Sequence, residues 1–269
     1  MKKFLALLTL SSMLIIGCNK EKTKQENNAT SDSSLVNPLS KFAVDSLKLE
    51  DSLRIDKNLS LTFSSKIITF SGLESKTLLD SIYAQEDLIL EDYSKENLAK
   101  ALHHKMQNYY DEEKLSLKEY KPEFSQFWNM TSAMEMISHQ NQYLTIQYTG
   151  DGYTGGAHGY YYEKYKVFDL KNNKTVQLSD VITEEDSSVW KRILMDNFLK
   201  NDSENKQSEM LLVEEIPLNN NFYFDKENLY FLYNQYEITA YAAGPVLIKI
   251  PFSDIKPFLN SDFKKRMNL

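Results

Sequence analysis

The chain has 269 residues, a formal net charge of −7 at pH 7 and a single cysteine. An acidic surface repels nucleic acid and anionic lipid headgroups, so the charge argues against a function that depends on binding either. A lone cysteine leaves no partner for a disulfide within the chain. The part that can fold, roughly 210 residues, suffices for one large domain or two small ones.

The first 17 residues have the pattern of a secretory signal peptide. Lys2 and Lys3 form a short positive region, and residues 4–16 are mostly apolar but too few to span a bilayer as a permanent helix. The run ends in IIGC, which resembles the lipobox of bacterial lipoproteins, whose cysteine is lipidated and becomes the first residue after cleavage. We therefore predict a signal peptide over residues 1–17 and lipidation at Cys18. An ordinary secretory signal with a chance cysteine is the alternative.

Residues 18–57 are predicted to form a flexible tether behind the lipid anchor. The stretch NKEKTKQENNATSDSS, which starts at Asn19, is polar and charged and has no aromatic residue. Such a composition cannot bury enough apolar surface to offset the entropy of an ordered chain. Apolar residues between Phe42 and Leu53 leave a short helix possible within this range. Signal cleavage would remove two lysines from a net charge of −7 and leave about −9.

Residues 58–150 are predicted to form the N-terminal half of an α+β fold. Apolar residues recur at helical spacing behind Ser94, a suitable N-cap, which predicts a helix over residues 94–111. β-Branched and aromatic residues in partial alternation predict strands over residues 59–70, 123–139 and 143–149.

Residues 151–260 are predicted to form the C-terminal half, although the two halves could be one unit. Strands are predicted over residues 160–170 and 245–251, a hairpin over 221–224 and 229–233, and helices over 187–199 and from Ser253 to Leu259. Strands outnumber helices and follow one another closely. The expected class is therefore α+β, with antiparallel sheet and helices packed on one face.

Five of the eight glycines lie in GDGYTGGAHGYYYEKY, residues 150–165. A phosphate-binding P-loop needs a lysine and a serine or threonine after its last glycine, and a dinucleotide-binding loop needs a following helix. Here Gly159 is followed by Tyr160 and a predicted strand, so neither motif is present. The glycines are instead predicted to allow positive φ angles and a close approach between two strand backbones.

His158 in this loop has two interpretations. As a structural residue it would hydrogen-bond the loop backbone, and this is the interpretation we prefer. As a catalytic residue it would need a carboxylate such as Asp151 or Glu163 beside it, which would make the protein a cell-wall hydrolase or deacetylase. The sequence has no HExxH, CxxC or His-x-His motif, so no metal site and no other cofactor are predicted.

The remaining histidines and the tyrosines also have both structural and functional interpretations. His103 and His104 are predicted to be exposed on a helix, and His139 to lie in a turn. Tyrosines on strands usually pack a half-buried face, but exposed rings also stack on sugars and anchor protein interfaces. The residues predicted to contact a ligand are Tyr153, His158, Tyr160, Tyr162 and Tyr241.

Two segments together resemble a bacterial extracellular domain family of unknown function. The first segment is centred on YTGGAHG at residues 153–159, which follows the predicted strand YLTIQYTG and precedes YEKYKVFDLKNNKTVQLSDV. The second segment is FLYNQYEITAYAAGPVLIKIPFSDIKPFL, residues 231–259. The sequence is similar to the ectodomain of RsiV-type anti-sigma factors, which bind lysozyme, and to the non-catalytic part of PdaC-type peptidoglycan deacetylases. The resemblance spans roughly residues 60–260 and implies an envelope-facing binding module. A sigma-binding segment and a deacetylase domain are not matched, so those output activities are not expected.

Together these features predict a lipid-anchored, non-enzymatic binding protein of the bacterial cell envelope that faces away from the cytoplasm. The predicted partner is a cell-wall glycan or a secreted basic protein such as a lysozyme-like hydrolase. The negative charge favours the protein partner, because opposite charge speeds the encounter. The alternatives are the hydrolase or deacetylase built on His158 and a scaffold lipoprotein without a small ligand.

Overall fold

The computed structural model describes residues 42–118, 121–183, 188–202 and 206–269. The predicted signal peptide, Cys18 and most of the predicted tether lie outside the described residues. The described part belongs to one compact unit, Leu39–Leu269. Residue 150, the predicted border between the two halves, falls inside a strand, so the chain is not divided there.

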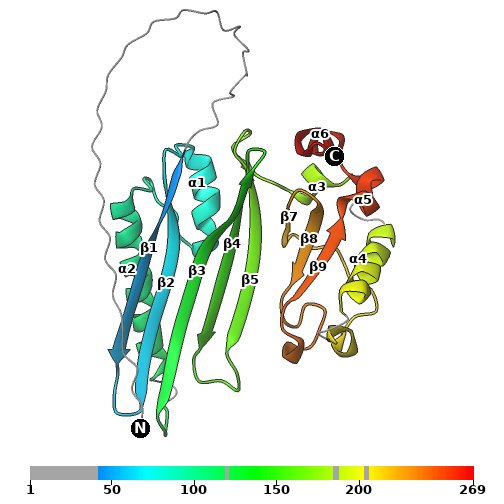
Figure 1. The fold of residues 1–269 in the computed structure, drawn as a ribbon. Coiled ribbons are helices and arrows are strands. Elements are labelled where there is room, and N and C mark those ends of the chain that lie inside the picture. The colour runs from blue at the N-terminus through cyan, green and yellow to red at the C-terminus, as the bar shows by residue number, and fades with distance from the viewer. Residues whose placement is uncertain (1–41, 119–120, 184–187, 203–205) are drawn as a thin grey trace, which may run out of the picture. The chain divides into compact units, whose positions relative to one another are not determined.

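A six-stranded sheet forms the larger layer of the fold (Figure 1). Its strands, in spatial order, are β1 (Ala43–Arg54), β2 (Leu59–Ser71), β3 (Gln126–Gln140), β4 (Tyr143–Tyr153), β5 (Tyr160–Asp169) and β6 (Lys174–Thr175). Neighbours pair antiparallel except β2 and β3, which run parallel. The parallel pair is possible because two helices lie between these strands in the sequence and return the chain to the end where β2 began.

Strand β1 lies within the range predicted as tether, so that prediction is wrong for residues 43–54. All 12 residues pair with β2. Leu47 and Leu49 on one side of the strand pack against the core, while the other side is exposed and polar. The charged residues of this segment made it look unstructured. Lys48, Glu50 and Arg54 occupy the solvent face of an edge strand, where charge is tolerated. Asp45 and Asp51 lie on the other face and bond Lys95 and the Tyr110 hydroxyl of α2.

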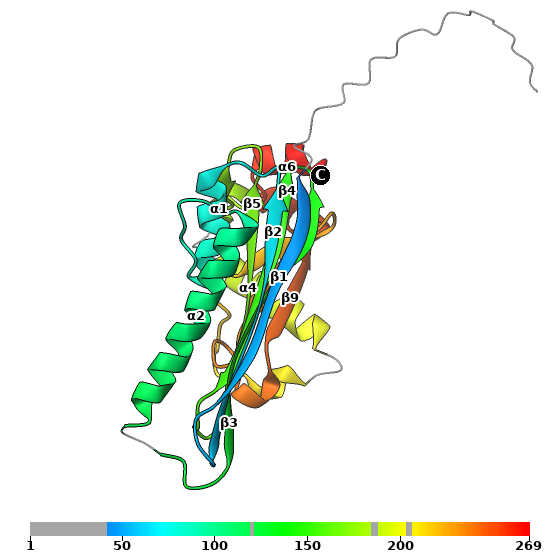
Figure 2. The ribbon, with the colours of Figure 1, turned by 90° about the vertical axis from the view of Figure 1, so that its left-hand side faces the viewer.

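Helices α1 (Lys76–Tyr83) and α2 (Lys95–Ser116) cover one face of the large sheet (Figure 2). The 3-10 turn η1 (Ala84–Glu86) lies between them. The predicted N-cap is confirmed, because the Ser94 hydroxyl accepts the N–H of Asn97. The buried stripe of α2 packs against the sheet. Among the described residues no helix is both long and apolar enough to cross a membrane.

A three-stranded antiparallel sheet forms the second layer, from β7 (Phe222–Phe224), β8 (Asn228–Tyr233) and β9 (Val246–Pro251). The predicted hairpin is confirmed as β7 and β8. The helical elements of this part are α3 (Leu178–Val181), α4 (Ser188–Asn201), η2 (Gln207–Met210), η3 (Tyr241–Ala243), α5 (Phe252–Ile255), η4 (Lys256–Phe258) and α6 (Ser261–Met267). Together with the large sheet they make the mixed α+β fold that the sequence predicts.

The predicted helix from Ser253 to Leu259, whose length Pro257 is expected to limit, is confirmed in part. Helix α5 ends at Ile255, a 3-10 turn that contains Pro257 follows it, and Ser253 lies inside α5 instead of capping it. Proline has no N–H to donate to a preceding carbonyl, so it does not extend α5. The longer C-terminal helix is α6, which begins after Asn260, whose side chain accepts the N–H of Asp262.

Two asparagine side chains connect the second layer to β5. Asn221 Oδ1 accepts the N–H of Tyr165 at 2.7 Å, and Asn234 Oδ1 accepts the N–H of Glu163 at 2.8 Å. Both asparagine amides also donate to the carbonyl oxygen of Glu163, at 2.9 and 3.1 Å. β6 pairs only with the last two residues of β5, so these side chains satisfy backbone groups that would otherwise lack a strand partner.

Candidate functional site

The glycine-rich loop connects β4 to β5, and two of its glycines are required by the backbone. Gly155 has a φ of +92°, in the left-handed region that side chains disfavour. A Cβ atom on Gly159 would lie 2.6 Å from the carbonyl oxygen of Gly152, because the two strands come close together there. The prediction that these glycines serve backbone geometry is therefore confirmed.

His158 is exposed on this loop and contacts the second sequence motif. Its Nδ1 lies 2.8 Å from the carbonyl oxygen of Gly159, and its ring stacks on that of Tyr241 with centroids 4.5 Å apart. The Tyr241 hydroxyl donates to the same Gly159 oxygen at 3.3 Å. A carbonyl only accepts, so Nδ1 carries the proton in this contact and Nε2 remains available. The backbone hydrogen bond is the one that the structural interpretation of His158 predicts.

Tyr236 completes an aromatic triad with His158 and Tyr241. Its ring centroid lies 5.7 Å from that of Tyr241 and 6.5 Å from that of His158. Tyr236 has a φ of +67° and is 59% exposed, so its ring is held out from the surface by an unusual backbone conformation. Sequence reasoning missed this residue, because nothing in the segment YNQYEI distinguishes one tyrosine from the other.

The other tyrosines predicted to bind a ligand lie elsewhere. The ring of Tyr160 lies over Gly152 and the ring of Tyr162 lies over Gly150. A Cβ atom added to Gly152 would be 2.5 Å from the Tyr160 ring, and one added to Gly150 would be 2.4 Å from the Tyr162 ring. Burial and then the charge of Glu86 raise the pKa of Tyr162 to about 12, which places this ring beside η1 on the helix-covered face. Tyr153 is half-buried against the core cluster under α2. Of the five predicted residues, the structure thus brings together His158 and Tyr241.

The carboxylates of the catalytic alternative have other partners. Asp151 accepts a hydrogen bond from the side-chain amide of Asn129 at 3.0 Å. Glu163 accepts hydrogen bonds from Gln147, Tyr161 and Tyr165 at 2.7, 3.1 and 2.5 Å. Within the described residues, no hydrogen bond or ion pair joins His158 to either carboxylate. In the same part of the chain, no group of three or more His, Cys, Asp or Glu side chains could hold a metal ion.

The remaining histidines are placed as follows. His103 and His104 are exposed on α2, as predicted. The prediction that His139 lies in a turn is wrong, because β3 continues through Gln140 and the turn is formed by Asn141 and Gln142, both with positive φ. The His139 ring lies 4.9 Å from that of Phe42, and burial lowers its pKa.

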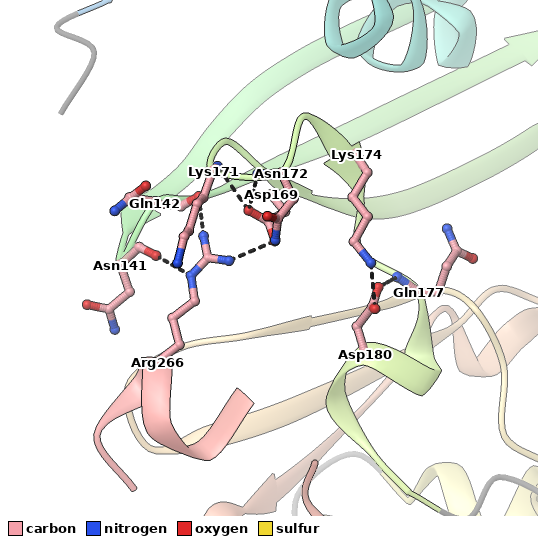
Figure 3. Close-up of polar contacts among 9 residues, drawn as sticks. All are labelled: Asn141, Gln142, Asp169, Lys171, Asn172, Lys174, Gln177, Asp180 and Arg266. Atoms are coloured by element: carbon pink, nitrogen blue, oxygen red, sulfur yellow. Dashed lines mark hydrogen bonds and ion pairs between the residues drawn. The ribbon is translucent and has the colours of Figure 1, made fainter. Parts of the chain in front are cut away.

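Arg266 forms a second polar cluster, which the sequence did not reveal (Figure 3). From α6 it donates to the carbonyl oxygens of Asn141 and Gln142, each at 2.9 Å, and to the carboxylate of Asp169 at 2.7 Å. Its guanidinium carbon lies 3.7 Å from the ring centroid of Tyr143. These contacts tie the C-terminal helix to the ends of β4 and β5. Because each of the three guanidinium nitrogens donates to an acceptor within the chain, we interpret this cluster as structural.

One comparison matches part of the chain to a family of unknown function. A family model described as "Protein of unknown function (DUF3298)" matches residues 166–253. A search of the curated proteins finds no match. The segment matched by the family model, residues 166–253, includes Tyr236 and Tyr241 but begins after His158. The family model therefore covers two of the three residues of the aromatic triad.

Two solved structures share the fold. A member of the DUF3298 family from Bacteroides fragilis NCTC 9343 is 22% identical, with a TM-score of 0.69, over 85% of this chain and 98% of that one. A DUF3298 family protein from Pseudomonas aeruginosa PAO1 is 13% identical, with a TM-score of 0.53, over 82% and 96%. At these identities the likeness concerns the fold.

Proposed function

We propose that this chain is a lipid-anchored binding protein of the bacterial cell envelope and that the aromatic triad is its recognition surface. The observation that supports this is the convergence of two motifs, 82 residues apart, on the carbonyl oxygen of Gly159. His158 and Tyr236 are exposed and Tyr241 is partly exposed, while the backbone beside them is crowded at Gly159 and has a positive φ at Tyr236. Rigid aromatic side chains at the surface are typical of binding hot spots. The lipobox-like sequence at Cys18 supports the anchor.

The partner that we propose first is a basic secreted protein, such as a lysozyme-like hydrolase. The chain carries a net charge of −7, and Glu237, next to Tyr236, is exposed. Opposite charge would steer such a partner to the surface and raise the association rate. The resemblance to the lysozyme-sensing RsiV-type ectodomains points to the same class of partner.

A cell-wall glycan is the second candidate. The rings of His158 and Tyr241 stack on each other with planes inclined by 30°, so each ring covers one face of the other and an aromatic surface remains on the outer face. Such surfaces stack on the apolar faces of sugar rings, while the phenol hydroxyl and the free imidazole nitrogen can bond sugar hydroxyls.

Calorimetry with purified chain distinguishes these partners. Lysozyme and soluble peptidoglycan fragments are titrated separately at low and moderate salt, and binding to lysozyme should weaken as salt rises. Tyr236→Ala should weaken binding by about tenfold or more, as expected for a hot-spot residue. Phe127→Ala is the control, because Phe127 is 70% exposed in β3 and lies outside the triad. If neither ligand binds, or both variants behave alike, the proposal fails.

The catalytic alternative has a separate test. Muropeptides are incubated with the wild-type chain and with His158→Ala, and products are separated by chromatography. Turnover by the wild type that disappears in a variant with an unchanged melting temperature would replace the binding proposal with an enzyme.

A further inference from the structure

A cavity of about 710 Å³ lies between α2 and residues 87–92, on the helix-covered side of the large sheet. One wall is the segment 87–92, and the other is a stripe of α2 from Asn97 to Glu112; Met130 of β3 contributes to the lining. Cavities of roughly 300–1,000 Å³ accommodate small organic ligands. At 1.5 Å per residue the stripe on α2 is about 22 Å long, which suits an elongated molecule.

The lining of this cavity is apolar in its middle. Leu88, Tyr109 and Met130 contribute carbon surface, and Leu88 and Tyr109 are buried. Ile89, also in the lining, is 74% exposed. A large aliphatic side chain that is exposed to solvent beside a cavity is typical of surfaces that bind apolar groups.

The ring of Tyr109 contributes to the apolar surface of the cavity, while its hydroxyl is closed off from solvent. The residue is only 6% exposed, and the hydroxyl has no hydrogen-bond partner among the described residues. An oxygen that solvent does not reach does not face an open cavity, so Tyr109 offers a ligand its carbon atoms.

The charged groups around the cavity determine which sign of charge a ligand should carry. The lysines are already paired, Lys100 with Glu96 at 2.6 Å and Lys105 with Glu86 at 2.9 Å. Carboxylates outnumber lysines in the lining, which contains Asp87, Glu91, Asp92 and Glu112 against Lys100 and Lys105. This excess of negative charge favours a positively charged group on the ligand.

We propose that this cavity binds a small cationic amphiphile, with an elongated apolar body that packs on Leu88, Tyr109 and Met130 and an ammonium head near the carboxylates. The site is distinct from the aromatic triad in residues and in ligand chemistry, so either proposal can fail without the other.

Two matched fluorescent probes test the ligand class with the full chain. Dansylcadaverine carries an ammonium group at the end of a five-carbon chain, and N-dansyl-6-aminohexanoate carries a carboxylate there. Dansylcadaverine should bind with a blue shift and an increase in emission, and the carboxylate probe should bind about tenfold more weakly or less. Absence of binding by dansylcadaverine, or equal affinity for the two probes, would overturn the proposal.

Two matched variants test the location of this site. His104→Trp should fill the groove and abolish dansylcadaverine binding, while His103→Trp, on the next exposed residue of α2 and outside the lining, should leave it unchanged. Equal effects of the two tryptophans would remove the assignment.

Discussion

Glu86 and Lys105 form an ion pair that is largely removed from water. The two side chains are 0% and 19% exposed, and the Lys105 ammonium lies 2.9 Å from Glu86 Oε2 and 3.0 Å from the Glu86 carbonyl oxygen. Glu86 Oε1 has no hydrogen-bond partner among the described residues. The attraction between the charges therefore has to offset the desolvation of both, and removal of one partner should be far more harmful than removal of both.

The first prediction concerns this pair. Lys105→Met should lower the free energy of unfolding by about 3–5 kcal/mol, because it leaves the Glu86 carboxylate buried without a counter-ion. The double variant Glu86→Leu/Lys105→Met should recover most of that loss. Lys100→Met is the control, since Lys100 and Glu96 are 69% and 77% exposed and such a pair contributes about 0–1 kcal/mol. Urea unfolding measures all four proteins; equal losses in Lys105→Met and Lys100→Met would contradict the prediction.

The second prediction concerns Asp169, which is 4% exposed beside Arg266. Burial alone would raise the pKa of this carboxyl, but hydrogen bonds from Arg266 and Asn172 outweigh burial and hold it below the usual 3.8. A lowered pKa in the folded state means that the stabilisation is fully present above about pH 4 and is lost as the pH falls through the folded pKa.

Asp169→Asn should therefore lower the free energy of unfolding at pH 7 by about 1–3 kcal/mol, the value of hydrogen bonds to a charged group. The difference from the wild type should shrink as the pH falls below about 4. Urea unfolding at a series of pH values measures it, and Asp196→Asn, at an exposed position of α4, controls for the loss of one carboxylate. A difference that stays constant down to pH 2.5 would show that the charge of Asp169 is not responsible.

At the scale of elements, β5 depends on side chains for part of its hydrogen bonding. Asn221 precedes β7 and Asn234 follows β8, so the second sheet holds β5 through two residues at its ends. The third prediction is that Asn221→Ala lowers the free energy of unfolding by about 1–3 kcal/mol, because it leaves the buried N–H of Tyr165 unpaired. Hydrogen exchange should accelerate at the amide of Tyr165 and stay slow at Tyr148 in the middle of β4. Unchanged exchange at Tyr165 would mean that water replaces the asparagine.

The elements that the sequence predicts correctly are those whose pattern depends on local burial. Strands β2 to β5, α2 with its Ser94 cap and the hairpin of β7 and β8 follow from periodicity and turn residues. The elements that it misses depend on distant partners. β1 is half charged and is ordered by pairing with β2, and the parallel alignment of β2 with β3 is decided by the helices between them.

The same distinction applies to the candidate site. The sequence identifies His158 and Tyr241 because each stands in an unusual motif. It cannot show that Tyr236 joins them, since that contact depends on a positive φ angle and on a turn from the second layer. Tyr160 and Tyr162 are adjacent to the loop in sequence, but strand alternation places them on the helix-covered face, where their rings cover glycines instead of meeting the triad.

At the scale of the whole molecule, the segment that matches the family model is not a structural unit. Residues 166–253 begin within β5 and end before α6, so the match divides the large sheet. The core of the second layer includes Tyr143 from β4, whose ring lies 5.1 Å from that of Phe224. Arg266 likewise depends on acceptors at Asn141 and Gln142. Each layer is therefore completed by residues from the other part of the chain.

The last prediction follows from this interdependence. A fragment of residues 151–269, the predicted C-terminal half extended to the end, would lose the strand partner of β5, the ring of Tyr143 and two of the acceptors for Arg266. We expect it to melt without a cooperative transition, while residues 42–269 unfold in a single step, because β5, Tyr143 and Arg266 couple the two sheets. Circular dichroism at rising temperature compares the two, and near-ultraviolet spectra report whether the tyrosine rings are held in fixed positions.

Mixing the fragment with residues 42–150 should restore the near-ultraviolet signal of fixed tyrosines, since the missing strand and the Tyr143 ring are then supplied by a second chain. A sharp melting transition in the isolated fragment would show instead that the second layer has enough apolar burial of its own, and that the contacts through Tyr143 and Arg266 join two independent folding units.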